Sequence, residues 1–129
     1  KHGYEFEADL AFESQDPNAL AENYDALILP GGGAPEALRI EAPTAADIVA
    51  AFDEQETLIA AICHGVQLMI SADVLDGREA TGYWTLEVDV ENAGATYVDD
   101  AAVVDENFVT ARHPGDLPDW LDALLAAAK

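Results

Sequence analysis

Two short apolar segments, each ending in a glycine-containing loop, constrain the fold of this chain most strongly. Residues 24–30 run Tyr-Asp-Ala-Leu-Ile-Leu-Pro into three successive glycines, and residues 57–62 run into Cys63-His64-Gly65. Each segment has the length and composition of a buried strand, and sequence able to form a helix follows each loop. This alternation predicts an α/β fold with a parallel sheet covered by helices on both faces.

Weaker patterns predict the remaining elements. Residues 5–12 begin with alternating charged and apolar side chains, which is typical of a half-exposed edge strand. Asp-Pro-Asn at 16–18 predicts a turn, and residues 105–107 predict the turn of a hairpin. The other predicted elements are helices at 34–38, 44–54 (capped by Thr44), 66–75, 86–92 and 117–125 (capped by Asp116), and strands at 79–81, 96–98, 101–104 and 108–110.

The two glycine-containing loops predict where a functional site would form. Both follow the carboxyl end of a predicted buried strand, and parallel sheets bind ligands at that edge. We therefore expect the loop at 31–33 and Cys63 to face one another.

The charge balance of the chain is extreme. Its 26 acidic residues outnumber five basic ones, which gives a formal net charge of −21 at pH 7. Such a surface repels nucleic acids and anionic membranes, because phosphate binding depends on Lys and Arg. The acids are spread among apolar residues, as on the solvated surface of a halophilic protein. We therefore expect neither a nucleic-acid nor a membrane partner, and we expect stability to fall at low salt.

Length and cysteine content bound the class of protein. The 129 residues have room for one domain, predicted over 1–129. The sequence contains no apolar run long enough to span a membrane and no secretory signal pattern. A single cysteine cannot form an internal disulfide, and a lone thiol is typical of a reducing compartment. These features predict a soluble, cytoplasmic protein.

Cys63 is the main candidate for chemistry. It lies between a predicted buried strand and a predicted helix, where unpaired N–H groups favour a thiolate. Gly65 suits a tight strand-to-helix turn. The alternative is an inert core cysteine, because cysteine is among the most frequently buried residue types. Position alone leaves these two interpretations about equally supported.

Neighbouring residues could assist a nucleophile. His64 is a candidate base, although adjacent side chains diverge on a regular helix and would meet only at the turn. The glycines at 31–33 could present backbone N–H groups to an oxyanion, or could form a plain flexible turn. That loop lacks the lysine and Ser/Thr of a phosphate-binding loop. His2, His64 and His113 show no ligand spacing, so we predict no metal and no cofactor.

Five successive segments resemble one known family. Their order and spacing are similar to those of the ThiJ/PfpI family, in its PfpI branch, and the similarity runs along the whole chain. The resemblance implies a flavodoxin-like or Rossmann-like α/β fold with a nucleophile elbow at a strand-to-helix turn. The segments are 29–36 (Leu-Pro-Gly-Gly-Gly-Ala-Pro-Glu), 60–68 (Ala-Ala-Ile-Cys-His-Gly-Val-Gln-Leu), 71–78 (Ser-Ala-Asp-Val-Leu-Asp-Gly-Arg), 80–83 (Ala-Thr-Gly-Tyr) and 91–95 (Glu-Asn-Ala-Gly-Ala).

The resemblance also implies roles for individual residues. Cys63 would be the nucleophile with His64 beside it, and Glu36 would complete a triad from a neighbouring subunit. Gly32, with Gly31 beside it and the backbone N–H of His64, matches the oxyanion positions, and Tyr83 matches an aromatic residue that lines the substrate pocket. The implied assembly is therefore a homo-oligomer, a dimer, trimer or hexamer, with a shared active site. Without the resemblance, Glu36 reads as one more solvated acid.

The chain departs from the family pattern at its start. Family members begin with a strand, a helix and a second strand. The first loop of this segment carries a buried glutamate that forms a hydrogen bond with the cysteine. Here Lys1-His2-Gly3-Tyr4 resembles the segment after those elements. The numbered chain is then a fragment, a cleaved or truncated protein, or one whose missing part another chain supplies.

Three functions remain open from the sequence. The first is a cysteine-dependent hydrolase, deglycase or glyoxalase-like enzyme acting on small carbonyl adducts or peptides; a small pocket with Tyr83 and Trp84 favours small electrophiles. The second is a glutamine amidotransferase-like domain, but His113-Pro114-Gly115 lacks the required His-x-Glu pair. The third is a non-enzymatic redox or stress-response protein with Cys63 as its sensor.

Overall fold

A four-stranded sheet forms the centre of the molecule, described by a computed structural model over residues 5–128. Its order is β1-β2-β6-β5, and the first three strands are parallel. Only β5 runs antiparallel, because a tight hairpin turn joins it directly to β6. The predicted α/β fold with a mostly parallel sheet is confirmed. The strands are β1 (Ala26–Leu29), β2 (Leu58–Ile62), β5 (Val103–Asp105) and β6 (Phe108–Ala111).

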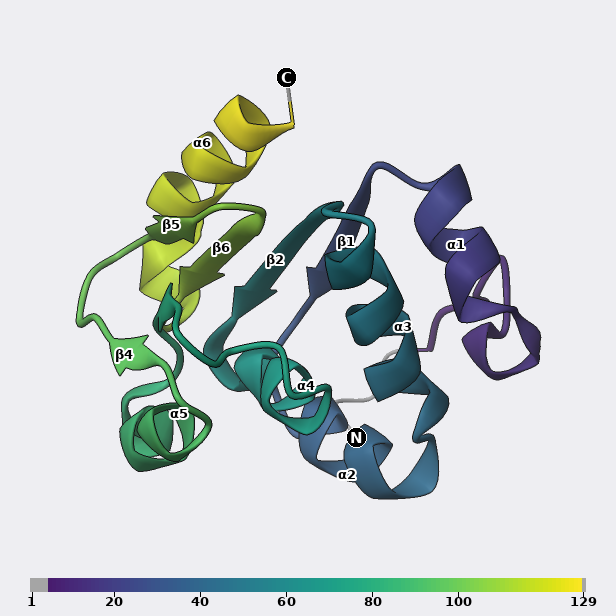
Figure 1. Ribbon diagram of the computed structural model, residues 1–129, viewed down its shortest axis with the longest axis horizontal. Coiled ribbons are helices and arrows are strands. Elements are labelled where there is room, and N and C mark those ends of the chain that lie inside the picture. Colours follow the sequence, from purple (N-terminus) through teal and green to yellow (C-terminus); the bar gives the residue numbers. More distant parts are fainter. Residues whose placement is uncertain (1–4, 129) are drawn as a thin grey trace.

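Strand β2 is buried along its whole length and divides the core into two clusters. Ile59 and Ala61 face the larger cluster with α3 and α4, whereas Leu58, Ala60 and Ile62 face the smaller cluster with α6. Alternate residues of a strand point to opposite faces, so this apolar run serves both clusters. Figure 1 shows α3 and α6 on opposite sides of the sheet. The helices are α1 (Pro17–Asn23), α2 (Ala34–Glu41), α3 (Thr44–Glu54), α4 (Val66–Ser71), α5 (Glu87–Asn92) and α6 (Leu117–Ala127).

A second, two-stranded parallel sheet lies beside the first (Figure 1). It consists of β3 (Glu79–Ala80) and β4 (Thr96–Tyr97), with α5 between them in the chain. All three elements fall within the predicted ranges. Their importance for the site is that the loop from β3 to α5 passes beside the end of β2.

The prediction of a strand over residues 5–12 is wrong. The described part of this segment has no strand, Phe6 is 93% exposed and Leu10 is 51% exposed. Alternation of charged and apolar side chains stabilises a strand only where a neighbouring strand supplies hydrogen bonds and apolar contacts. Here only a 3₁₀ turn forms, at Phe12–Ser14. The Lys1-to-Tyr4 resemblance and His2 lie outside the described residues.

Other local predictions are corrected by tertiary contacts. Residues 16–18 start α1 and do not form an isolated turn, with Pro17 at the first helical turn, where its missing N–H costs nothing. The side chains of Thr44 and Asp116 make no cap hydrogen bond at the starts of α3 and α6. Strand β1 is not fully buried, because it lies at the edge of the sheet and leaves Ile28 44% exposed.

Among the described helices, none is long and apolar enough to cross a membrane.

Candidate functional site

The chain makes a sharp turn between β2 and α4. A 3₁₀ turn at Cys63–Gly65 joins them, and Cys63 has a left-handed φ of 60°. This conformation is uncommon for a residue with a Cβ, and such strain is concentrated at functional sites. Gly65 is required by close approach, since a Cβ there would collide with the carbonyl of Leu29 at the end of β1. The predicted elbow is therefore built against the neighbouring strand.

The glycine loop packs directly against this elbow. A Cβ on Gly31 would lie 2.8 Å from the Cβ of Cys63 and 3.3 Å from the backbone nitrogen of His64. Only a glycine allows the loop to approach so closely. The expectation that the two loops face one another is confirmed. Gly32, which follows, is exposed and has a φ of 76°.

Cys63 and His64 interact despite being adjacent in sequence. The Sγ of Cys63 lies 3.3 Å from the Nδ1 of His64, and both side chains are partly buried. They meet because the left-handed turn at Cys63 breaks the helical geometry in which adjacent side chains diverge. A thiol beside an imidazole nitrogen can transfer its proton to that nitrogen when the tautomer leaves it free.

Aromatic residues from the β3–α5 loop lie beside this pair. The ring of Tyr83 stacks on His64, with centroids 4.8 Å apart and an interplanar angle of 27°. The backbone N–H of Tyr83 also donates to the carbonyl of Cys63 at 3.1 Å. Tyr83 is thus held beside the turn by one contact with His64 and one with the backbone of Cys63. The ring of Trp84 follows, 5.9 Å from that of Tyr83.

Glu36 is not brought to Cys63 in the described structure. It lies in the first turn of α2, which packs beside the Cys63–Gly65 turn. Its side chain is exposed, and it has no hydrogen bond or ion pair with residues 5–128. The position suits a carboxylate offered to another subunit, as the family resemblance implies, and it equally suits a solvated acid.

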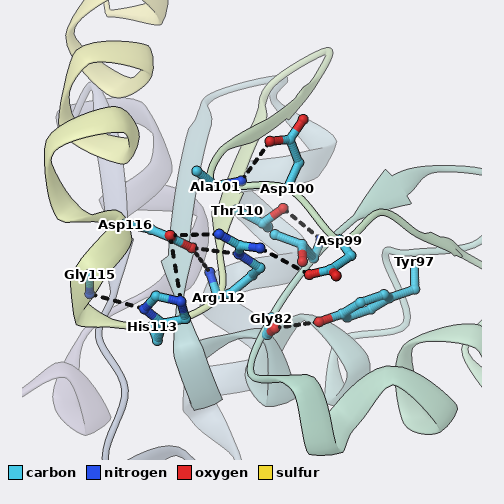
Figure 2. Close-up of polar contacts among 11 residues, drawn as sticks. Gly82, Tyr97, Asp99, Asp100, Ala101, Thr110, Arg112, His113, Gly115 and Asp116 are labelled. Atoms are coloured by element: carbon cyan, nitrogen blue, oxygen red, sulfur yellow. Dashed lines mark hydrogen bonds and ion pairs between the residues drawn. The ribbon is translucent and has the colours of Figure 1, made fainter.

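An ion-pair cluster that sequence reasoning missed lies where β6 ends (Figure 2). Asp116, which is 3% exposed, accepts hydrogen bonds from the backbone N–H, Nε and an Nη of Arg112 at 2.9–3.0 Å. A second Nη of Arg112 donates to Asp99 at 3.0 Å. Residue 111 pairs with residue 62, so this cluster lies at the same sheet edge as the elbow. The four-residue spacing of Arg112 and Asp116 could have predicted this ion pair. The sequence instead predicts Asp116 as a helix cap, because its position before a helix also fits that role.

Hydrogen bonding shifts the pKa values of both ions in the cluster. The hydrogen bonds with Arg112 hold the pKa of Asp116 below its ordinary value, although burial acts in the opposite direction. The hydrogen bonds to Asp116, and then to Asp99, raise the pKa of Arg112. His113 takes part only at the margin: its Nδ1 accepts from Gly115 at 3.1 Å, and its Nε2 is 3.7 Å from Asp116. Arg112 and Asp116 are therefore both charged at neutral pH.

Two hollows in the surface lie away from Cys63. The larger, of about 820 Å³, opens at the amino ends of the strands, opposite the elbow. The smaller, of about 340 Å³, is apolar and lies between β1, α1 and α3. Residues 5–128 contain no group of three or more His, Cys, Asp or Glu side chains that could hold a metal.

A mostly parallel α/β sheet flanked by helices, with a sharp strand-to-helix turn after a buried strand, defines the fold class. Within this class, the chain matches the DJ-1/PfpI family over residues 1–127. It is 47% identical over 121 residues to "Deglycase TK1284" of Thermococcus kodakarensis, covering 94% of this chain and 70% of that protein. The chain therefore belongs to the DJ-1/PfpI family.

Two further relatives agree with this assignment. "Putative cysteine protease YraA" of Bacillus subtilis is 41% identical over 117 residues, covering 91% of this chain and 66% of that protein. The crystal structure of a ThiJ/PfpI domain protein from Brachyspira murdochii matches with a TM-score of 0.82 and 26% identity, covering 92% of this chain and 66% of that one.

Proposed function

We propose that this chain is a cysteine-dependent hydrolase or deglycase, in which the Cys63 thiolate attacks the carbonyl carbon of small carbonyl adducts or of peptides. The observation that carries the proposal is the 3.3 Å contact between Sγ of Cys63 and Nδ1 of His64 at a left-handed elbow. The packing of Gly31 against the same elbow supports it. So do the names of the relatives, a deglycase and a cysteine protease. Glyoxalase-like chemistry would start from the same attack.

For a peptide substrate, the proposed steps conserve atoms and charge. The Cys63 thiol gives its proton to His64, and the thiolate forms a C–S bond with the carbonyl carbon. The carbonyl oxygen takes the negative charge, near the backbone N–H groups of Gly32 and His64. Collapse of this species breaks the bond to the leaving amine, which takes the proton from His64. Water then hydrolyses the thioester and restores the thiol.

We assign Glu36 to the active site of a neighbouring subunit in a homo-oligomer, and Tyr83 to the wall of the substrate pocket. The exposure of Glu36 beside the elbow supports the first assignment, because the side chain is free for a partner. The stacking of Tyr83 on His64 supports the second. A carboxylate hydrogen-bonded to an imidazole would hold it in the orientation that accepts the thiol proton.

Turnover by point variants tests the proposal. We expect the wild type in high salt to consume methylglyoxal adducts of amino acids or to cleave a fluorogenic peptide. The turnover rate of Cys63→Ala should be lower by a factor of about 1,000 or more. Mixing Cys63→Ala with Glu36→Ala tests the shared site, since mixed oligomers would regain part of the activity. Unchanged turnover in Cys63→Ala would exclude the proposed mechanism, and no recovery on mixing would exclude the shared carboxylate.

A redox sensor is the second candidate. Cys63 is the only thiol of the chain and is partly exposed, so peroxide can reach it. In that case, one equivalent of peroxide would be consumed per chain, with sulfenic acid at Cys63 and no turnover of either substrate. Turnover of many equivalents of adduct or peptide would decide for the enzyme.

A further inference from the structure

Three aromatic rings form a stack that leads from the thiol to solvent. His64 contacts the Sγ of Cys63, Tyr83 stacks on His64, and Trp84 lies beside Tyr83 with ring centroids 5.9 Å apart and ring planes tilted by 41°. Trp84 is 67% exposed at the outer end of this stack. Scattered exposed apolar residues are ordinary on a protein surface. Trp84 differs from them because its ring is continuous with the candidate catalytic pair.

Backbone hydrogen bonds hold the stack at a fixed distance from the elbow. The N–H of Tyr83 donates to the carbonyl of Cys63 at 3.1 Å, and the N–H of Leu86 donates to the carbonyl of Tyr83 at 2.8 Å. On the other side, the hydroxyl of Tyr97 donates to the carbonyl of Gly82 at 2.8 Å (Figure 2). Trp84 therefore offers its ring from an anchored segment, at little cost in ordering on binding.

Trp84 has no structural role comparable to that of the other tryptophan. Trp120 is 5% exposed, and its indole N–H donates to the carbonyl of Val109 at 3.2 Å, so it belongs to the core. The indole N–H of Trp84 has no partner among residues 5–128. The exposed ring and the free N–H are both open to a ligand.

The charge of the protein decides which ligand fits this ring. The three arginines are engaged, Arg39 with Ser71, Arg78 with Asp53 and Arg112 with Asp116. The first turn of α5, directly after the Trp84 turn, carries Glu87 and Asp89. A cation is therefore favoured over an anion, and a planar guanidinium stacks best on an indole. The chain itself contains a contact between a guanidinium and an aromatic ring: the guanidinium of Arg78 lies 3.9 Å from the centroid of the phenyl ring of Phe108.

We propose that Trp84 is a specificity-determining residue that stacks on the guanidinium of an arginine side chain in a peptide-borne substrate. The inference rests on the proposed function, and it assigns the substrate class as reactive groups carried on arginine-containing peptides. Two ring contacts separate Trp84 from His64, so the arginine is not the residue attacked.

Binding of matched peptides tests this proposal without requiring turnover. The probes are an acetylated, amidated alanine tetrapeptide with one arginine and the same peptide with citrulline, which is planar and uncharged. At high salt, which screens long-range attraction, we expect the wild type to bind the arginine peptide about 3- to 30-fold more tightly. Trp84→Ala should lose this preference and Trp84→Phe should keep part of it. The control Val88→Ala, another exposed apolar residue one turn further on, should be unchanged.

Fluorescence adds a readout that a structural role would not change. The arginine peptide should shield Trp84 from acrylamide quenching, whereas in Trp84→Phe the signal of buried Trp120 should not respond. Equal affinity for the two peptides, absence of binding, or a preference that survives in Trp84→Ala would overturn the proposal. If the peptides bind as expected but the wild type turns over no adduct or peptide, the proposed function fails and the assignment of Trp84 as the arginine-binding residue stands.

Discussion

At the scale of single residues, close packing around Cys63 explains why small side chains surround it. A Cβ at residue 31 would approach the Cβ of Cys63, and a Cβ at residue 65 would collide with the Leu29 carbonyl. The elbow and the glycine loop therefore share one rigid contact surface. Backbone atoms cannot move aside as a flexible side chain can, so a substitution must displace the whole turn.

Gly65→Ala tests this packing. We expect it to lower the free energy of unfolding by about 1–3 kcal/mol, the usual cost of forcing an extra group into a packed site. We also expect turnover to fall more than stability, because the turn that carries Cys63 must shift. Urea unfolding and kcat/KM measured on the same sample check both effects.

Gly77→Ala is the matched control. Gly77 has a left-handed φ of 77°, whereas the φ of Gly65 is −57°, and a Cβ at residue 77 would meet no atom within 4 Å. Its cost should come from backbone strain alone, about 1 kcal/mol, with activity retained. Equal loss of activity in the two variants would show that the collision at Leu29 is not what positions Cys63.

At the scale of secondary-structure elements, the Arg112–Asp116 pair connects the end of β6 to the start of α6. Three hydrogen bonds join the two residues, and the carboxylate is almost completely buried. Replacing Asp116 would remove these hydrogen bonds and leave Arg112, whose side chain is 26% exposed, with Asp99 as its remaining ion partner. The pair therefore fixes how the last helix leaves the sheet.

Asp116→Asn should lower the free energy of unfolding by about 1–3 kcal/mol at pH 7, the usual effect of losing hydrogen bonds to a charged group. The pKa of Asp116 is depressed in the folded state, so its contribution is fully present above the ordinary carboxyl pKa of about 3.9. That contribution is lost as the pH falls through the lower folded value. Urea unfolding of wild type and variant at pH 7 and pH 3 should show the difference shrinking in acid.

Asp119→Asn supplies the control for this experiment. Asp119 is an exposed acid in the first turn of the same helix, so its replacement changes net charge equally but breaks no buried pair. Its effect at pH 7 should stay within about 0.5 kcal/mol. A difference between wild type and Asp116→Asn that does not change with pH would contradict the assigned charge state.

At the scale of the whole molecule, the net charge of −21 dominates. Three of the five basic residues are already engaged in described contacts, so mutual repulsion of the carboxylates remains largely uncompensated. The Debye length shrinks from about 10 Å at 0.1 M salt to about 3 Å at 1 M, which removes most repulsion between exposed charges. Subunits of the proposed oligomer would repel one another by the same rule.

The melting temperature should therefore rise by several degrees between 0.1 M and 2 M potassium chloride. The mass of the assembly in solution should rise over the same range, as subunits associate. Sorbitol at matched osmolality is the control, since it is excluded from protein surfaces without screening charge. The same melting temperature at both salt concentrations would refute charge repulsion as the limiting factor. A melting temperature that rises as much in sorbitol as in salt would refute it as well.

Local sequence determined the central strands, the elbow and the glycine loop of this protein. An apolar run of strand length, a glycine two residues after Cys63 and a glycine run after β1 are features that neighbouring residues specify by themselves. They were sufficient to predict the sheet and the meeting of the two loops. The family resemblance added the candidate roles of Glu36 and Tyr83, which remain proposals.

Only the tertiary structure decided the features that depend on residues distant in sequence. Residues 5–12 have the alternation of a strand but do not form one, and β1 lies at the edge of the described sheet. Asp116 occupies the N-cap position of α6. Its side chain nevertheless points to Arg112, which donates three charge-assisted hydrogen bonds to it. The stack of Trp84, Tyr83 and His64 likewise exists only because the β3–α5 loop passes the end of β2. Sequence patterns specify local conformation, whereas packing between distant segments decides which side chains are buried, paired or left open.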